Sequence, residues 1–232
     1  MNINGRTALV TGAAVGTGRA ISLALAARGA RVIAADVDDD AGRETGRRSG
    51  GTVRFVHLDV TDRAALAALI RDAEPTVLIN NAGGGAHVPW RWPDATSEQW
   101  ASTLEVNLVA PMRATQLALP LMQAAGGGAV VNMASSAACG GEAHPWPEYA
   151  TAKAGLVRFT TSLRGFDQRV RVNCLVPDWI ATERLTDAER ALDPPPIPLS
   201  QITEQTVRLV TDDALSGRVI VLDCGRPPEL LD

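Results

Sequence analysis

The sequence predicts a single α/β domain in which helices cover both faces of a doubly wound parallel sheet. Its length of 232 residues suits one domain. Short runs that are apolar along their whole length alternate with amphipathic stretches of helical length. Strands that are apolar on both faces and separated by helices are typical of a parallel sheet buried on both sides. We therefore expect one domain over residues 1–232.

Each expected strand is a short apolar run with flanking turn residues. The runs are Thr7–Val10, Arg31–Ala35, Val53–Leu58, Thr76–Asn80, Ala129–Met133, Val170–Val176 and Val219–Leu222. Helical patterns lie between them, notably Ser97–Ala124 and Glu148–Phe166. The weakest pattern is at 178–205, where three consecutive prolines exclude a helix interior. We predict that this segment is a short lid over a substrate.

Charge and cysteine content exclude several classes of protein. The chain has 22 Lys and Arg against 26 Asp and Glu, a net charge of −4, which argues against a nucleic-acid binder. No apolar run approaches the ~20 residues of a membrane span, and the N-terminus lacks a signal-peptide core. Three scattered cysteines suit neither a disulfide scaffold nor a metal site. We expect a cytoplasmic protein with reduced thiols and no metal.

A glycine-rich turn joins the first expected strand to a helix. The residues Gly12, Val15, Gly16, Thr17 and Gly18 stand in this turn. Glycines there permit a tight turn and close approach of a pyrophosphate, and the helix N-terminus then faces the anion with free N–H groups. Glycine clusters are common in turns, but the strand–turn–helix context is the one that dinucleotide binding requires.

Asp36 ends the second strand, 18 residues after Gly18, where a carboxylate can bond the adenosine ribose hydroxyls. A carboxylate repels the 2′-phosphate of NADP, so the sequence favours NAD(H). An alternative interpretation is a solvated acidic helix start, which also accounts for Asp38, Asp39 and Asp40.

The chain contains one lysine, Lys153, and one tyrosine, Tyr149, four residues apart. That spacing places both on the same helix face. A lone lysine among many arginines indicates a position where arginine cannot substitute, although chance placement is the alternative.

Taken in order, these motifs resemble the short-chain dehydrogenase/reductase family. The resemblance extends over nearly the whole chain and rests on Thr11-Gly12-x-x-x-Gly16-x-Gly18, Asp59-Val60, Asn80-Asn81-Ala82-Gly83, Asn107, Ser135-Ser136, Tyr149-x-x-x-Lys153, and Pro177 with Thr182. It implies a single-domain Rossmann fold with a seven-stranded parallel sheet, and a homotetramer or dimer.

The resemblance also implies site residues. The catalytic set falls on Asn107, Ser136, Tyr149 and Lys153; Ser136 is preferred to Ser135 because it precedes Tyr149 by 13 residues, a spacing common in the family. Cofactor contacts are implied for Asp59 and Val60 beside the adenine, for Asn81, Ala82 and Gly83 in the supporting turn, for Tyr149 and Lys153 at the nicotinamide ribose, and for Pro177 and Thr182 near the nicotinamide.

These residue types suit hydride transfer between an alcohol carbon and nicotinamide, because a proton on the alcohol oxygen must move as well. A free phenol titrates near ~10. The ammonium of Lys153 would lower the pKa of Tyr149 and let it act as general acid or base. Ser136 would hold the substrate oxygen, and Asn107 would hold a water linked to Lys153. Each residue also has an ordinary structural interpretation, as a surface tyrosine, a turn serine or a locally bonded asparagine.

Loops at the carboxyl ends of the strands are rich in tryptophan, with Trp90, Trp92, Trp146 and Trp179. Trp146 and Trp179 are candidates for contact with an apolar or ring-bearing substrate, but they can equally pack the loops or a subunit interface. One departure from the family stands beside them. Asp178 follows Pro177 where the family usually has glycine, and this alters the expected nicotinamide pocket.

The function expected from these features is an NAD-dependent oxidoreductase acting on a secondary alcohol or ketone. Two alternatives remain open: an NADPH-linked 3-oxoacyl-thioester reductase, and a non-catalytic dinucleotide sensor. Asp36 argues against the first, and the complete catalytic set argues against the second.

Overall fold

The computed structural model describes residues 1–85, 89–140 and 143–231, and its described strands form one sheet of eight in the order β3-β2-β1-β4-β5-β6-β7-β8. The strands are β1 (Thr7–Thr11), β2 (Arg31–Asp36), β3 (Val53–His57), β4 (Val77–Asn80), β5 (Gly128–Met133), β6 (Val170–Pro177), β7 (Val219–Leu222) and β8 (Glu229–Leu231). The chain order reverses between β1 and β4, where doubly wound sheets bind ligands.

The seven expected strands are confirmed and are mutually parallel, but the expected strand count is one too low. β8 pairs antiparallel with β7, in register Val219 with Leu231. Its three residues follow Pro227 and Pro228 and are largely exposed, so neither length nor periodicity marks them as a strand. Antiparallel edge strands on parallel sheets are common.

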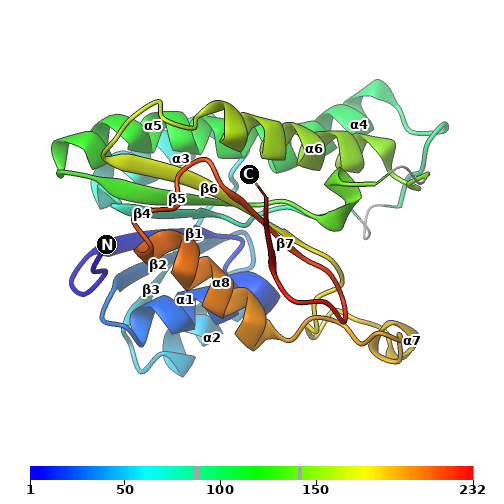
Figure 1. Cartoon of the computed structure of the whole chain (residues 1–232), viewed down its shortest axis with the longest axis horizontal. Helices are drawn as coiled ribbons and strands as arrows, with labels where there is room; N and C mark the ends of the chain where they lie inside the picture. The colour runs from blue at the N-terminus through cyan, green and yellow to red at the C-terminus, as the bar shows by residue number, and fades with distance from the viewer. Residues whose placement is uncertain (86–88, 141–142, 232) are drawn as a thin grey trace.

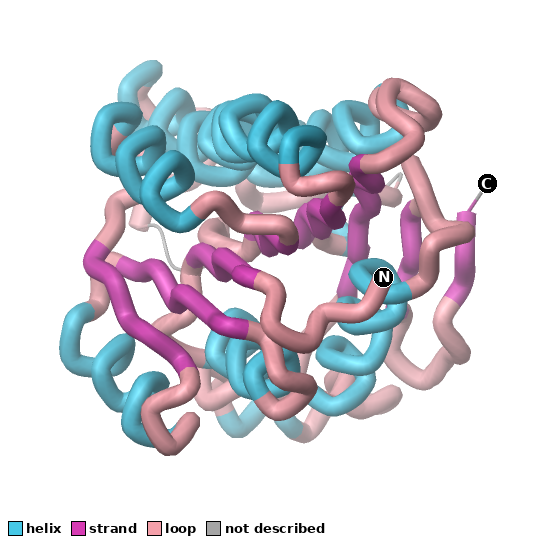
Figure 2. The backbone as a smooth tube through the Cα atoms, turned by 90° about the vertical axis from the view of Figure 1, so that its left-hand side faces the viewer, coloured by secondary structure: helices cyan, strands magenta, loops and turns pink. Residues whose placement is uncertain are grey.

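Helices cover the sheet in two layers (Figure 1). One layer contains α1 (Gly16–Ala26), α2 (Asp39–Arg48) and α8 (Leu199–Thr211). The other contains α3 (Arg63–Ala73), α4 (Ser97–Leu104), α5 (Ala110–Ala124) and α6 (Pro147–Ser162). Figure 2 shows the twisted strands running between these layers.

Alternate residues of the central strands point to opposite layers, which accounts for their continuous apolar character. Ala8 and Val10 of β1 pack in the cluster that holds Ile21 of α1, whereas Leu9 packs with Leu66 of α3. All five are fully buried. Burying one large apolar side chain contributes about 1.5–3 kcal/mol, so both faces hold the sheet in place.

The long helix expected over Ser97–Ala124 is continuous but not uniform. Residues Glu105–Val109 form a π-helical turn between α4 and α5. π turns are rare and occur often at functional sites. This one contains Asn107, a residue proposed above for catalysis.

The segment 178–205 is only partly a loop. Its last residues belong to α8, which begins at Leu199 and buries Ile202. The loop part closes on itself through a bridge between Ile180 and Ile197, and it carries the short helix α7 (Asp187–Arg190), which projects from the body in Figure 1. The candidate lid is therefore the stretch 178–198, anchored at both ends.

Candidate active site

A large cleft of about 1530 Å³ lies at the carboxyl ends of the strands. The glycine turn after β1 and Asp36 at the end of β2 line one part of it. Ser135 after β5 and Asp178 after β6 line another part. The cleft thus joins the expected cofactor residues to the expected catalytic residues.

Two glycines of the turn, Gly12 and Gly18, have no room for a side chain. Gly12 and Gly16 have φ of +64° and +53°, the left-handed region that glycine tolerates. A Cβ added to Gly18 would lie 2.1 Å from the carbonyl oxygen of Gly12. The Asn81 amide closes the turn from the other side, donating to the carbonyl oxygens of Thr11 and Gly12 at 3.0 and 2.9 Å.

A carboxylate already stands at the start of α1. The N–H of Gly16 donates to Oε1 of Glu183 at 2.9 Å, and the Arg19 guanidinium lies 3.8 Å from the same oxygen. Burial raises the pKa of Glu183. Its backbone hydrogen bonds, including that from Gly16, lower the pKa, as do the charges of Arg19 and Arg184. Together these lowering effects outweigh burial, so the net shift of the pKa is downward. The first turn of α1 therefore binds an anion within this chain, as a pyrophosphate cradle must.

Asp36 lies where the sequence predicts, on the cleft at the end of β2. Its Oδ2 accepts the N–H of Ala14 at 2.9 Å and its Oδ1 accepts the N–H of Asp38 at 3.1 Å. Asp59 and Val60 line the same part of the cleft. Sequence reasoning missed Val37, whose side chain is 58% exposed on this lining; its place directly after Asp36 was the available signal.

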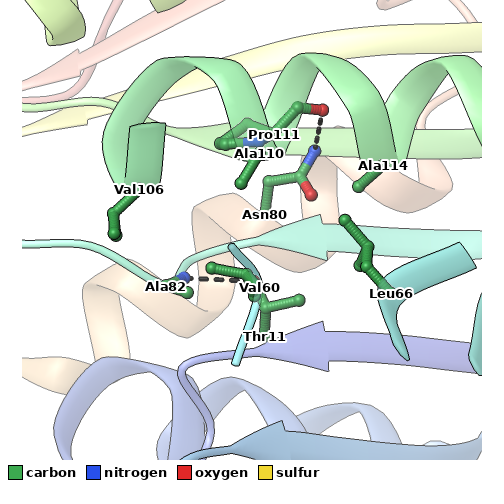
Figure 3. A pocket seen from close by; sticks show the side chains of 9 residues that line it. All are labelled: Thr11, Val60, Leu66, Asn80, Ala82, Val106, Ala110, Pro111 and Ala114. Atoms are coloured by element: carbon green, nitrogen blue, oxygen red, sulfur yellow. Dashed lines mark hydrogen bonds between the residues drawn. The ribbon is translucent and has the colours of Figure 1, made fainter. Parts of the chain in front are cut away.

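Thr11 and Asn80 line a small pocket that borders the cleft and shares Val60, Ala82 and Val106 with it. Thr11 Oγ1 accepts the N–H groups of Asn81 and Ala82, both at 3.1 Å. Figure 3 shows the Thr11–Ala82 bond and, above it, the Asn80 amide pointing to α5. That amide donates to Pro111 O at 3.3 Å and to Asn132 Oδ1 at 2.8 Å. These bonds tie β1, β4, β5 and α5 together next to the cleft.

Asn107 is buried and bonded to the loop after β4. Its Oδ1 accepts the N–H of Gly84 at 3.0 Å, and its Nδ2 donates to Gly84 O at 3.1 Å and to Thr103 O at 2.9 Å. A Cβ on Gly83 would lie 2.4 Å from Asn107 Oδ1 and 3.3 Å from Lys153 Nζ. Asn107 therefore fixes a glycine loop that lies directly against Lys153.

Lys153 is 4% exposed, and its ammonium donates to Met133 O at 2.9 Å. Burial lowers the pKa of Lys153 to about 8. Its Nζ lies 5.6 Å from the centre of the Tyr149 ring. The sequence prediction that these two side chains share a helix face is confirmed, since both lie on α6 and meet.

Tyr149 interacts with a different serine from the one that spacing favours. Burial raises the pKa of Tyr149, and a hydrogen bond with the Ser135 side chain acts in the opposite direction. Gly85 approaches so closely that a Cβ there would lie 2.6 Å from Tyr149 Cγ. The His144 ring is 5.9 Å away between centroids.

Ser136 instead turns toward β6. Its hydroxyl donates to Oδ1 of Asp178 at 3.0 Å. Ser135 ends the extended stretch after β5, and its Oγ also accepts the N–H of Ala137, so a short 3₁₀ turn begins at Ser136. That turn sends the two neighbouring hydroxyls in different directions, which a spacing count cannot reveal.

The two candidate tryptophans differ. Trp146 is held by the loop after β4, because its indole N–H donates to Trp90 O at 2.9 Å and the Arg91 guanidinium lies 5.1 Å from its ring centre. Trp179 is 43% exposed. Both line the cleft. Trp146 therefore packs the loop and also faces the space where a substrate would bind, whereas the ring of Trp179 is exposed to a ligand in the cleft.

Pro177 and Thr182 also line the cleft. Thr182 lies against the glycine turn, with its Cγ2 3.4 Å from the position of a Cβ on Gly16. The described residues contain no cluster of three or more His, Cys, Asp or Glu able to hold a metal ion. Within the same described ranges, no helix has the length and apolar character needed to cross a membrane.

Comparison with known proteins agrees with this geometry. A family model described as short chain dehydrogenase matches residues 6–193. The 3-oxoacyl-(acyl-carrier-protein) reductase FabG of Escherichia coli is 34% identical over 205 residues, covering 82% of this chain and 81% of that protein. The human 15-hydroxyprostaglandin dehydrogenase (NAD+) is 30% identical over 265 residues, covering 97% and 94%.

Solved structures give the same result. A putative short-chain alcohol dehydrogenase from Sinorhizobium meliloti has a TM-score of 0.87 at 28% identity, covering 97% of both chains. A putative NAD(P)-dependent gluconate 5-dehydrogenase from Beutenbergia cavernae, with NADP bound, has a TM-score of 0.83 at 30% identity, again covering 97% of both chains.

Proposed function

Since the chain belongs to the short-chain dehydrogenase family, we propose that it is an NAD-dependent oxidoreductase that acts on a secondary alcohol or ketone. One observation carries the proposal. Tyr149, Asn107 and Ser135 line the cleft that also holds the glycine turn, and the buried ammonium of Lys153 lies behind them on α6, 5.6 Å from the centre of the Tyr149 ring. A phenol, a cation and a hydroxyl grouped in this way are the groups needed to move a proton on an alcohol oxygen.

The residues present fit a nicotinamide dinucleotide. The left-handed glycines leave space at the start of α1, and the Gly16 N–H already holds a carboxylate there, which supports an anion site for the pyrophosphate. Asp36 would bond the adenosine ribose hydroxyls, with Asp59 and Val60 beside the adenine. When bound, the cofactor supplies the hydride donor or acceptor.

Tyr149 is the general acid in reduction and the general base in oxidation. Burial alone raises the pKa of Tyr149, so proton transfer near neutral pH needs a positive charge nearby. Lys153 supplies that charge from the next turn of α6, where Met133 O holds its ammonium in place. Asn107 holds the Gly83–Gly84 backbone against Lys153, and it is a positioning residue for this pair.

We assign the role of holding the substrate oxygen to Ser135. The spacing of 13 residues favours Ser136, but the Ser136 hydroxyl donates to Asp178, whereas the Ser135 side chain acts on Tyr149 and lowers its pKa. A hydroxyl that acts on the general acid is placed to bond the oxygen that receives the proton.

The cofactor is the first part of the proposal to test. We expect NADH to bind at least about tenfold more tightly than NADPH, about 1.4 kcal/mol, in a titration that follows energy transfer from tryptophan to nicotinamide. Asp36→Ala should reduce that ratio, whereas the exposed Asp72→Ala serves as a matched control. A preference for NADPH in the unmodified protein would overturn the NAD assignment.

A second candidate is an NADPH-linked 3-oxoacyl-thioester reductase, which the similarity to FabG favours. Asp36 opposes it, because a carboxylate repels the 2′-phosphate. The two candidates separate in a coupled assay: oxidation of secondary alcohols with NAD+ supports the first, and reduction of a 3-oxoacyl thioester with NADPH supports the second. A non-catalytic dinucleotide sensor would give neither reaction.

Three further properties belong to the proposal. The substrate is a small molecule with an apolar or ring-bearing part near Trp146 and Trp179, which line the cleft. The protein forms a homo-oligomer, a dimer or tetramer, and sedimentation velocity measures this directly. We also propose a cytoplasmic location, with neither nucleic acid nor membrane as a partner, consistent with the net charge of −4.

A further inference from the structure

An unusual carboxylate lies beside the proton-transfer residues. In the register of β5 and β6, Met133 is opposite Leu175, so Ser136 and Asp178 each stand three residues past a paired position. The Asp178 N–H donates to Leu222 O of β7 at 2.9 Å, which fixes its backbone between two strands. The side chain is half-buried and lines the cleft.

The charge of Asp178 is not neutralised by the described part of the chain. No ion pair among the described residues includes it. Ser136 donates its hydroxyl to Oδ1, and Cys224 is the other hydrogen-bonding neighbour. A carboxylate has about four acceptor positions, so these two contacts leave it with capacity for a further donor.

The Asp178 and Asp223 carboxylates act on the thiols at this end of the cleft. Burial and the Asp178 carboxylate raise the pKa of the Cys224 thiol, and burial and Asp223 raise that of Cys139. Arg184, which lines the cleft, is exposed and acts on Glu183, beside the glycine turn. A partly desolvated carboxylate without a cation is costly, and a ligand cation would offset that cost.

We propose that Asp178 selects substrates that carry an ammonium group close to the reacting carbon, so that the preferred substrates are amino alcohols or amino ketones. This inference rests on the proposed function. Ser135 and Ser136 are adjacent in the chain and line the same cleft as Tyr149 and Asp178, and the Ser136 hydroxyl donates to Asp178. An ammonium bound to Asp178 therefore lies near the carbon whose oxygen meets Ser135 and Tyr149. The exposed Trp179 ring, next in the chain, adds an aromatic surface suited to a cation or a ring.

Three alcohols of nearly equal shape test the inference: 2-amino-1-phenylethanol, the neutral 1-phenyl-1-propanol, and 1-phenyl-1,2-ethanediol. Their binding is measured by calorimetry on the protein alone and on the protein saturated with NADH, where an alcohol cannot be oxidised. We expect the amine to bind at least about tenfold more tightly than the neutral alcohol, about 1.4 kcal/mol.

Asp178→Asn keeps the shape and an acceptor for Ser136 but removes the charge. We expect the ratio of the two dissociation constants to fall below about threefold. Asp178→Gly, which has the residue usual in the family, should give the same loss and guards against misfolding of one variant. Asp223→Asn removes a neighbouring carboxylate that bonds neither serine, and it should keep most of the preference.

The inference is overturned by equal binding of amine and neutral alcohol, by a preference that survives in Asp178→Asn, or by a diol that binds as tightly as the amine. An equal loss of the amine preference in Asp223→Asn would also overturn it, because the preference would then come from the overall negative charge of this region and not from Asp178. Turnover of the same alcohols with NAD+ tests the proposed function separately. A strong amine preference without turnover would sink the proposed function and leave the ammonium site standing.

Discussion

The two ends of the cleft are built in different ways. The cofactor end comes from one continuous strand–turn–helix unit, β1 to α1, closed by Asn81 and followed by Asp36. The substrate end is assembled from loops after β5 and β6 that meet through side chains, as Ser136 and Asp178 do. Local motifs fix the first end, whereas the second depends on register and on which hydroxyl points where. We expect mutations to have general consequences at the first end and substrate-dependent ones at the second.

The largest effect is expected where the two ends meet. Tyr149→Phe removes the proposed proton carrier and retains the ring that packs against Gly85. Turnover should fall by about 10³-fold, within the usual range for general acid–base catalysis. NADH affinity, measured by tryptophan-to-nicotinamide energy transfer, should change little by comparison. Substantial residual turnover would show that another group moves the proton.

Substitution of the two serines gives the next largest effect. It tests whether the catalytic serine is Ser136, which the spacing favours, or Ser135, which the structure favours. Ser135→Ala removes the hydroxyl that lowers the pKa of Tyr149 and should lower kcat by about 10²-fold, as loss of one donor to a developing oxyanion does. Ser136→Ala is the matched control, one residue away. It should cost less than about tenfold for a neutral alcohol. Steady-state kinetics with both variants decides the assignment, and the reverse order of effects would restore Ser136 to the catalytic role.

We expect the buried charge of Lys153 to lower the stability of the folded protein, although the proposed turnover depends on it. Burial lowers its pKa to about 8, below the unfolded value of 10.5, so the folded chain carries a charge that it disfavours at neutral pH. Lys153→Met should abolish most turnover and raise stability at pH 7 by about 1–2 kcal/mol, after loss of the bond to Met133 O. For a chain of this length that is about 2–8 °C in Tm.

The pH dependence follows from the same shift. Between the folded and unfolded pKa values, the unfolded state holds the extra proton, so wild-type stability rises with pH relative to the variant. The advantage of Lys153→Met should be full below about pH 8 and should disappear toward pH 10.5. Thermal melts of both proteins across this range measure it. A difference independent of pH would mean that packing, not charge, causes the change.

The sequence predicts where the residues of the proposed cofactor end lie, because its signals are local. Gly12 and Asp36 lie within one β-α-β unit, and the structure places both on the cleft. The substrate end was predicted less completely. The position of Ser135 depends on a 3₁₀ turn that begins one residue later, and the exposed three-residue β8 forms only because β7 lies beside it. Asp178 was visible as a departure, but its contact with Ser136 required the register of two strands.

Glu183 gives the smallest expected effect, and it couples the two ends. It belongs to the segment 178–198, yet its carboxylate bonds the Gly16 N–H where a phosphate would bind. Glu183→Gln should therefore tighten NADH binding by about threefold to tenfold, because an anion no longer competes for the helix start. Asp187→Asn, an exposed acid on the same segment, is the control for a change in net charge. Weaker NADH binding in Glu183→Gln would show that the carboxylate supports the bound cofactor, for example through Arg19, and that the two ends cooperate and do not compete.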